Sequence, residues 1–470
     1  MKKFIALLLT LVLALSMAAC GSKDADVTTD EPTATEENTT DEKDAEVNTE
    51  DPGDAKEADD MKKYEGQTLT LWSFTDELKP AIEFFENKFG VTVELTIIPT
   101  EDYPQAIRPV LQSGVGAPDV YTAEAAFVEE FVNNGFYADL SADFGVDAWA
   151  ADYTDYVFAT GTDYDGSVRA LSWQMTPGGL FYRRSIAKEV LGTDDPDEIS
   201  AMFSTFDGLF DVGAKMKEAG YKLFPDTGAF RHFTNPDQIP WVDADNNLQI
   251  PDTKVDFFDY SKKLKDDGLT AEATEWSPAW FNSMYGPVTV GETGVETEVF
   301  CFALPTWGLH YVLKTAQPEG AEGGNPLSGD FGVASGPNSY FWGGTWLGVY
   351  KDSEKKDLAF EFVRLMAHDE EFLKGWLSET GDVTSILGIQ EEYAADFSEP
   401  FLAGQNHVEF FIEAGKAIDA NRITMYDKDL DALFSQAVAD YVEGLTPTVE
   451  EALAIFKEGV QSAYPEINVE

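Results

Sequence analysis

Ten tryptophans are the residues of this sequence best suited to bind a ligand. An indole is the largest flat apolar side chain, and it can pack against the C–H face of a ring such as that of a sugar. Six of the ten fall at expected strand ends, at expected domain crossings or in a short helix with polar flanks: Trp72, Trp173, Trp280, Trp307, Trp342 and Trp346. Each of these could instead belong to the hydrophobic core, as we expect for Trp149 and Trp376. As a group, we predict that at least three line a cleft.

A ring stacked in this way would also need partners for its rim of hydroxyl groups. The candidates are Asp119, Glu124, Arg231 and Glu275, because carboxylates accept and guanidinium groups donate several hydrogen bonds. Taken one at a time, each of the four is expected to be a solvated or structural charge more often than a ligand contact. The predicted site therefore combines flat apolar surfaces with a charged rim.

The sequence gives little support to an enzyme. Its four histidines do not have the spacing of a metal site: His232, His310, His368 and His407. It contains neither a Gly-x-Ser-x-Gly elbow nor a phosphate-binding loop. Carboxylates are so numerous that a glycoside hydrolase stays an alternative, which would need two of them ~5–9 Å apart across a cleft. We predict no catalytic residue and no cofactor.

One stretch imitates the start of a calcium-binding loop, with Asp243, Asp245 and Asn247 at alternate positions. The sixth position of such a loop needs glycine for a sharp turn, and here it is Leu248. The twelfth needs a bidentate glutamate, and here it is Lys254. We therefore predict an ordinary turn and no metal.

The first 20 residues have the pattern of a secretory signal. Lys2 and Lys3 precede an apolar run over residues 4–15, and Ala18 and Ala19 come directly before Cys20. The run is shorter than the roughly 20 residues of a membrane-spanning helix. The segment resembles a bacterial lipoprotein signal, which implies that Cys20 becomes the lipid-bearing N-terminus. The alternative is an ordinary cleaved signal with an incidental cysteine. Either way, we predict a location outside the cytoplasm, and with the lipid an anchor on the extracellular face of the cell membrane.

Charge and length exclude some functions and suggest two domains. The formal net charge of −54 argues against binding to nucleic acid or an anionic membrane surface, since both need clustered Lys and Arg. Residues 21–63 are acidic and poor in large apolar side chains, so we predict a disordered linker. The remainder exceeds the ~250–300 residues that one core usually supports. Cys301 lies in an apolar stretch and is expected to be a buried, unreactive thiol.

Hydrophobic periodicity predicts that the folded part opens with alternating strands and helices. We expect strands over residues 69–74, 91–98 and 117–121, and helices over 78–89, 103–112 and 124–132, with Asp76 as the first N-cap. This order is typical of a parallel α/β sheet, which binds ligands beyond the carboxyl ends of its strands. A further strand is expected over 167–173, and Pro177-Gly178-Gly179 is predicted to be a crossing between domains.

Taken together, the chain resembles the extracellular solute-binding proteins of carbohydrate ABC importers, the family that includes maltose-binding proteins. The resemblance rests on the order and spacing of short segments. They are residues 69–73, 112–120, 165–182, 303–307 and 343–367. It implies a fold of the periplasmic-binding-protein-like II class, with two α/β lobes, a hinge of several crossings and a ligand cleft between the lobes.

This resemblance also implies boundaries and partners. We expect an N-terminal lobe of residues 64–174 plus 342–388 and a C-terminal lobe of 175–341 plus 389–470. The implied function is capture of a carbohydrate, expected to be an oligosaccharide, and delivery to an ABC-transporter permease by a monomeric protein. The alternative from a different class is a surface lipoprotein that binds a peptide or a polyamine, since the many carboxylates could hold an amine.

Overall fold

The computed structural model describes residues 62–291, 293–419 and 423–469. The predicted signal, Cys20 and nearly all of the predicted acidic linker lie outside the described residues. The chain divides into the units Met1–Ala55 and Lys56–Glu470, and all that follows concerns the second. Within the described residues, every helix is either too short or too polar to cross a membrane.

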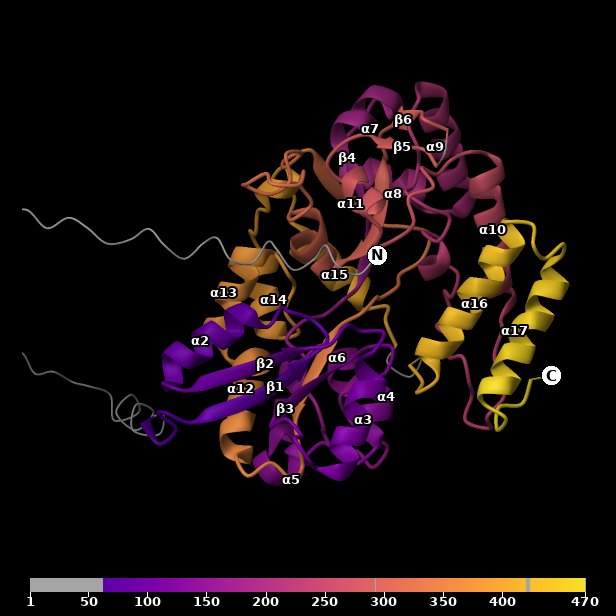
Figure 1. The fold of residues 1–470 in the computed structure, drawn as a ribbon. Helices are drawn as coiled ribbons and strands as arrows, with labels where there is room; N and C mark the ends of the chain where they lie inside the picture. Colours follow the sequence, from indigo (N-terminus) through magenta and orange to yellow (C-terminus); the bar gives the residue numbers. More distant parts are fainter. Residues whose placement is uncertain (1–61, 292, 420–422, 470) are drawn as a thin grey trace, which may run out of the picture. The chain divides into compact units, whose positions relative to one another are not determined.

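The first sheet has four strands in the order β2-β1-β3-β9 (Figure 1). They are β1 (Thr68–Ser73), β2 (Thr92–Ile97), β3 (Val120–Glu124) and β9 (Thr345–Val349). β1 is parallel to β2 and β3, whereas β9 runs antiparallel to β3, so that the sheet is mixed rather than purely parallel. The chain thus leaves this sheet after β3 and returns to it at β9.

Helices cover the first sheet and bury its central strands. α2 (Lys79–Phe89) packs against β2 and against α12 (Lys356–His368), which in turn packs on β9. Every residue of β9 is buried, which indicates that this strand is covered on both faces. The predicted helix over 103–112 is α3 (Tyr103–Ser113), and it ends as expected at Gly114, whose φ of 69° favours glycine.

The second sheet has the order β7-β4-β8. β4 (Gly178–Arg183) lies between β7 (Cys301–Pro305) and β8 (Phe331–Ala334) and is antiparallel to both. β4 begins at the predicted Pro-Gly-Gly crossing. A Cβ atom on Gly178 would overlap the ring of Tyr340, so the close approach of this ring to the strand requires glycine there. A separate hairpin pairs β5 (Val288–Thr289) with β6 (Glu296–Thr297).

Helices make up most of the rest of the described chain. α16 packs against both α10 and α17. The α-helices not yet given are α4 (Val128–Asn133), α5 (Leu140–Phe144), α6 (Asp155–Thr160), α7 (Arg184–Leu191), α8 (Pro196–Phe203), α9 (Phe206–Ala219), α10 (Asp252–Asp266), α11 (Pro278–Ser283), α13 (Glu370–Thr380), α14 (Leu387–Ala394), α15 (His407–Gly415), α16 (Asp427–Val442) and α17 (Val449–Ala463). Short 3-10 helices span Val146–Asp152, Arg231–Phe233 and Pro400–Leu402, and a π-helix spans Gly308–Leu313.

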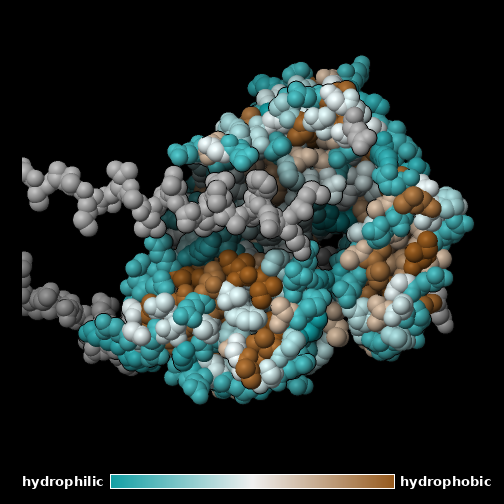
Figure 2. Space-filling model, viewed as in Figure 1, coloured by the Kyte–Doolittle hydropathy of each residue, from teal (hydrophilic) through white to brown (hydrophobic). Residues whose placement is uncertain are grey.

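Buried hydrophobic residues form two clusters, and the second sheet contributes to both. The first contains the side chains of β1, β3 and β9 together with Phe181 of β4, and the second contains Tyr182 of β4 and Phe300 beside β7. Cys301 is in the second cluster and is fully buried, as predicted, and burial raises the pKa of its thiol well above the ordinary value. Hydrophilic side chains cover most of the face drawn in Figure 2, with hydrophobic patches between them.

Three local predictions were wrong. Asp76 does not cap α2, because the N-cap is Leu78 and the Asp76 carboxylate instead pairs with Lys79 at 2.7 Å. The third strand, expected over 117–121, lies at Val120–Glu124. Residues 167–173 form no regular strand and make only isolated bridges, such as that between Leu171 and Leu347. Their apolar residues are buried by packing rather than by a continuous ladder.

Candidate functional site

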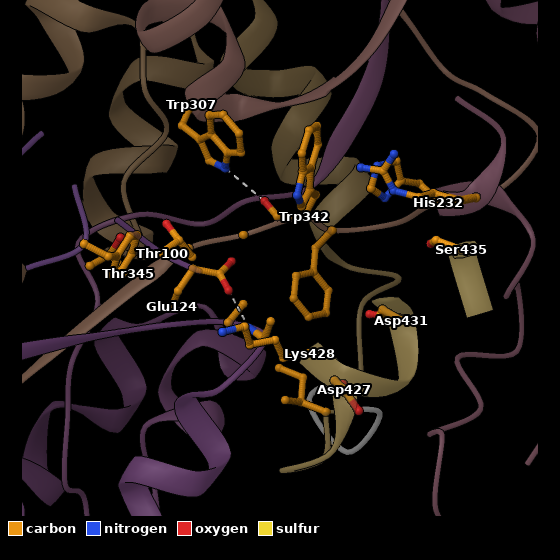
Figure 3. Close-up of a pocket in the computed structure, with 18 of the residues that line it drawn as sticks. Thr100, Glu124, His232, Trp307, Trp342, Thr345, Asp427, Lys428, Asp431 and Ser435 are labelled. Atoms are coloured by element: carbon orange, nitrogen blue, oxygen red, sulfur yellow. Dashed lines mark hydrogen bonds between the residues drawn. The ribbon is translucent and has the colours of Figure 1, made fainter. Parts of the chain in front are cut away.

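The described residues contain a pocket of about 740 Å³. Its walls come from both ends of the chain: the loop after β1, the end of β3, residues 231–241, Trp276, the start of the π-helix, residues 341–345 and α16. Figure 3 shows ten labelled side chains around this space, among them Glu124, Trp307 and Trp342. Four of the predicted site residues line it: Glu124, Arg231, Trp307 and Trp342.

Three indoles form an aromatic wall of this pocket, which we define as Trp276, Trp307 and Trp342. The ring centroids of Trp276 and Trp307 lie 6.1 Å apart with an angle of 12° between the planes. Trp342 stands at a steep angle to both, with centroid distances of 6.0 Å to Trp276 and 5.2 Å to Trp307. All three line the pocket, so they offer flat apolar surfaces in two orientations.

The backbone holds the aromatic wall in place. Trp307 follows β7, and its indole N–H donates a hydrogen bond of 2.9 Å to the carbonyl oxygen of Trp342 (Figure 3). Gly343, the next residue, has a φ of 70°. A Cβ atom there would lie 3.0 Å from Trp307 Nε1, so glycine permits both the turn and the approach of the indole. The two segments are therefore positioned together.

Trp276 has an unusual backbone for a large residue. Its φ is 63°, in the left-handed region that non-glycine residues rarely adopt, and its side chain is 46 % exposed. It comes directly before Ser277, whose side chain caps α11 by accepting a hydrogen bond from Trp280 N–H. Backbone strain of this kind persists where the surroundings fix it and is concentrated at functional sites.

Arg231 packs on the aromatic wall and carries an ion pair. Its guanidinium carbon lies 5.0 Å from the ring centroid of Trp342. Its Nη2 lies 3.0 and 2.9 Å from the two carboxylate oxygens of Glu275. Burial, together with the charge of Glu275, raises the pKa of nearby Asp226 to about 6. The predicted rim residues Arg231 and Glu275 are thus brought together, and they bind each other beside the indoles.

Glu124 ends β3 and points into the pocket (Figure 3). Its carboxylate accepts a hydrogen bond of 2.7 Å from the backbone N–H of Ala126. Burial raises the pKa of this carboxyl to about 7, while the charge of Lys428 acts in the opposite direction. Glu124 can therefore donate a hydrogen bond in its protonated form or accept one when ionised.

The first turns of α16 supply further polar groups. Asp427, Lys428 and Asp431 line the pocket (Figure 3). Burial and the charge of Asp431 raise the pKa of Asp427 to about 7. The Asp431 carboxylate accepts a hydrogen bond of 2.6 Å from the indole N–H of Trp241, another residue of the lining. This side of the pocket is acidic, and it is ordered by contacts within the protein.

Six of the predicted site residues do not line the pocket: Glu275, which pairs with Arg231, and five more. Trp173 and Trp346 are buried in the core cluster of the first sheet, where the indole N–H of Trp346 donates to the carbonyl of Val157 at 2.9 Å. Trp72 lies in β1 and packs against the same cluster. Trp280 is buried one layer behind Trp276, with centroids 5.2 Å apart.

The last of these residues, Asp119, has structural partners. Its carboxylate accepts hydrogen bonds of 2.9 Å from the backbone and the hydroxyl of Thr70, and one of 2.7 Å from Ser353. Lys355 lies 3.3 Å away. These bonds tie the start of β3 to β1 and to the turn after β9. All of the carboxylate's partners are therefore residues of the first sheet and its loops.

Sequence reasoning missed several residues of the lining. Trp276, Trp241, His232 and Tyr311 were not among the predicted site residues, although all four line the pocket. Trp276 had a usable signal, because it lies four residues before Trp280, which was among the predicted site residues. The other three have no distinguishing pattern, since their positions depend on contacts between distant segments.

Comparison with known proteins gives a consistent picture. Residues 81–400 match the family described as bacterial extracellular solute-binding protein. No curated protein matches the sequence. Among solved structures, the chain is similar to the ABC transporter associated binding protein from B. animalis subsp. lactis Bl-04, solved with beta-1,6-galactobiose. The TM-score is 0.69 at 19% identity, over 86% of this chain and 100% of that one.

Two further structures have the same fold. The GacH receptor of Streptomyces glaucescens GLA.O, solved unliganded and with acarbose, has a TM-score of 0.65 at 19% identity, over 86% of this chain and 100% of that chain. Maltose-bound T. maritima MalE3 has a TM-score of 0.64 at 17% identity, over 84% and 99% of the two chains. These likenesses confirm the predicted fold class, with two α/β lobes, and at such identities they speak for the fold alone.

Proposed function

We propose, since the chain belongs to the family of bacterial extracellular solute-binding proteins, that its pocket captures a carbohydrate and that the protein delivers it to an ABC-transporter permease. The single observation that carries this proposal is the aromatic wall, which faces a pocket of about 740 Å³ beside Glu124 and the carboxylates of α16. Indoles suit the C–H faces of sugar rings, and carboxylates suit their hydroxyl groups.

The size of the pocket and the structural neighbours favour a short oligosaccharide. Ligand pockets for drug-sized molecules are about 300–1,000 Å³ in volume, which is room for a few sugar rings. The three neighbours named above were solved with beta-1,6-galactobiose, acarbose and maltose, all of which contain more than one ring, whereas another was solved with alpha-D-tagatose. We propose the same class of ligand here, with Trp307 and Trp342 as its central contacts.

Delivery to a permease would follow from closure of the two lobes, which we assign to residues 64–174 plus 342–388 and 175–341 plus 389–470. A ligand that contacts both lobes stabilises the closed state by its differential affinity for that state. We propose that a monomer acts in this way without changing the sugar chemically. We also propose that a lipid on Cys20 holds the protein at the extracellular face of the cell membrane.

A thermal-shift screen tests the ligand class. Purified protein is heated with mono- and oligosaccharides, and separately with peptides and polyamines. Binding at a hundredfold excess over Kd should stabilise the fold by about 2.7 kcal/mol. We expect oligosaccharides to raise Tm in the wild type and much less in Trp342→Ala. A shift with an amine or a peptide but with no sugar would overturn the proposal, and release of reducing sugar during incubation would identify a glycoside hydrolase instead.

A further inference from the structure

Three side chains to which the proposed sugar binding gives no role meet at one edge of the pocket. Glu77 lies in the loop after β1, His310 in the π-helix and Asp382 directly after α13. One donor atom from each lies within 4.8 Å of the others, and His310 Nε2 is 2.8 Å from Glu77 Oε1. Among the described residues this is the group of His, Cys, Asp and Glu donors that is arranged closely enough to hold a metal ion.

Among these three residues, Asp382 has a buried position that needs an explanation. It is 0 % exposed, and its Oδ1 makes no hydrogen bond with any described residue. A buried carboxylate oxygen without a partner is costly, and such groups in folded proteins often mark an ion or water that has not been placed. Because Asp382 also belongs to the close group of donors, its unpartnered oxygen favours a ligand at this cluster.

The other oxygen of Asp382 is held in place. Its Oδ2 accepts hydrogen bonds of 3.2 Å from the indole N–H of Trp376 and 3.4 Å from the amide of Gln174. The imidazole of His310 lies edge-on to the same indole, with centroids 5.6 Å apart and an angle of 82° between the planes. Outer hydrogen bonds orient metal ligands in proteins, and here they hold the carboxylate of Asp382.

We propose that Glu77, His310 and Asp382 form a binding site for a divalent transition-metal ion such as Zn²⁺, which goes beyond the proposed capture of a sugar. One imidazole nitrogen and two carboxylate oxygens are ligands that zinc and its neighbours in the first row accept, whereas calcium prefers oxygen ligands alone. Donors around tetrahedral zinc are about 3.3 Å apart, so small side-chain rotations would complete the site.

The charge of the cluster and its place favour a cation. Two carboxylates and one imidazole can balance a divalent ion, and Lys314, whose charge acts on His310, already pairs with Glu399 at 2.8 Å. Glu77 lines the pocket, whereas His310 and Asp382 do not. A three-ligand metal site usually keeps a fourth position for water or another ligand, and Glu77 places that position beside the pocket.

Zinc content tests this site without any sugar, so the result is independent of the proposed carbohydrate function. The full chain is stripped with EDTA, incubated with Zn²⁺ in a large excess of Mg²⁺ to occupy the many surface carboxylates, separated from free metal and measured by mass spectrometry. We expect one more zinc per chain in the wild type than in His310→Gln. The matched control is His368→Gln, which alters a half-buried histidine outside the pocket and should keep that zinc.

A substitute variant and a crystallographic measurement complete the test of the metal site. If His310→Gln does not fold, Glu77→Gln replaces it, because Glu77 faces the pocket. Crystals of the wild type soaked in Zn²⁺ are then measured at the zinc absorption edge. An anomalous peak between the three side chains supports the proposal. Equal zinc in the wild type and the variant, or anomalous peaks only at other surface positions, would overturn it.

Discussion

The indole N–H of Trp307 donates a hydrogen bond of 2.9 Å to the backbone carbonyl of Trp342, which joins the segment after β7 to the segment before β9. Because both indoles line the pocket, this bond holds the Trp307 indole beside the backbone that carries the second flat surface. The site is thus set by the meeting of two chain segments, and its properties can be tested one side chain at a time.

Removal of the Trp342 indole should weaken sugar binding more than it weakens the fold. Trp342 is partly exposed and lines the pocket, so Trp342→Ala is expected to raise Kd about tenfold to a hundredfold, as for a central aromatic contact. Isothermal titration with the sugar found in the thermal screen measures this change. Trp149→Phe, which alters an indole stacked on His368 outside the pocket, should leave Kd unchanged.

Substitutions of Trp276 should affect the stability of the fold and the affinity for sugar differently. Its φ of 63° strains a non-glycine backbone, so Trp276→Gly relieves strain of about 1 kcal/mol and should have a higher Tm than Trp276→Ala. The same change removes one flat surface and should weaken sugar binding at least tenfold. Trp276→Ala is the matched variant, because it removes the indole but keeps the strain. A fall in Tm for glycine relative to alanine would contradict this account.

Glu124 should make the protein less stable as the pH rises. Burial raises the pKa of its carboxyl to about 7, so between about pH 4.5 and 7 the folded state retains a proton that the unfolded state has lost. The free energy of unfolding should therefore fall across this range by about 3 kcal/mol. Glu124→Gln should reduce this fall in denaturant titrations from pH 4.5 to 8, while the buried carboxyls of Asp226 and Asp427 still contribute to it. Glu101→Gln, which removes an exposed carboxylate of the same pocket, should not.

Arg231 and Glu275 should behave as an energetically coupled pair. Their contacts of 2.9 and 3.0 Å are partly shielded from water, so either Arg231→Met or Glu275→Gln leaves one uncompensated charge. A double-mutant cycle on the free energy of unfolding is expected to give a coupling of about 1–2 kcal/mol. Additive effects would show that solvent screens the pair. Loss of Arg231 should also weaken sugar binding, because the guanidinium packs on Trp342.

The sequence was sufficient for the alternation of strands and helices at the start of the fold, because each helix there has one clear apolar face. The sequence could not show which tryptophans line the pocket and which belong to the hydrophobic core. Trp342 and Trp346 lie four residues apart in one stretch rich in aromatic residues and glycine, so their surroundings in the sequence are alike. In the structure Trp346 belongs to β9, where every residue is buried, whereas Trp342 reaches the pocket. The difference depends on the turn at Gly343 and on contacts with Trp307, which join residues far apart in the chain.

Pairing between β3 and β9 has a consequence for how the protein is made. Tyr121 lies opposite Gly348 in the ladder, so the first sheet stays open along β3 until the ribosome has supplied residues from beyond the whole second sheet. Contacts this distant in sequence slow folding. A nascent chain that ends before residue 345 would expose an unpaired strand edge, and such edges template aggregation. Premature termination should therefore yield insoluble material rather than a smaller functional domain.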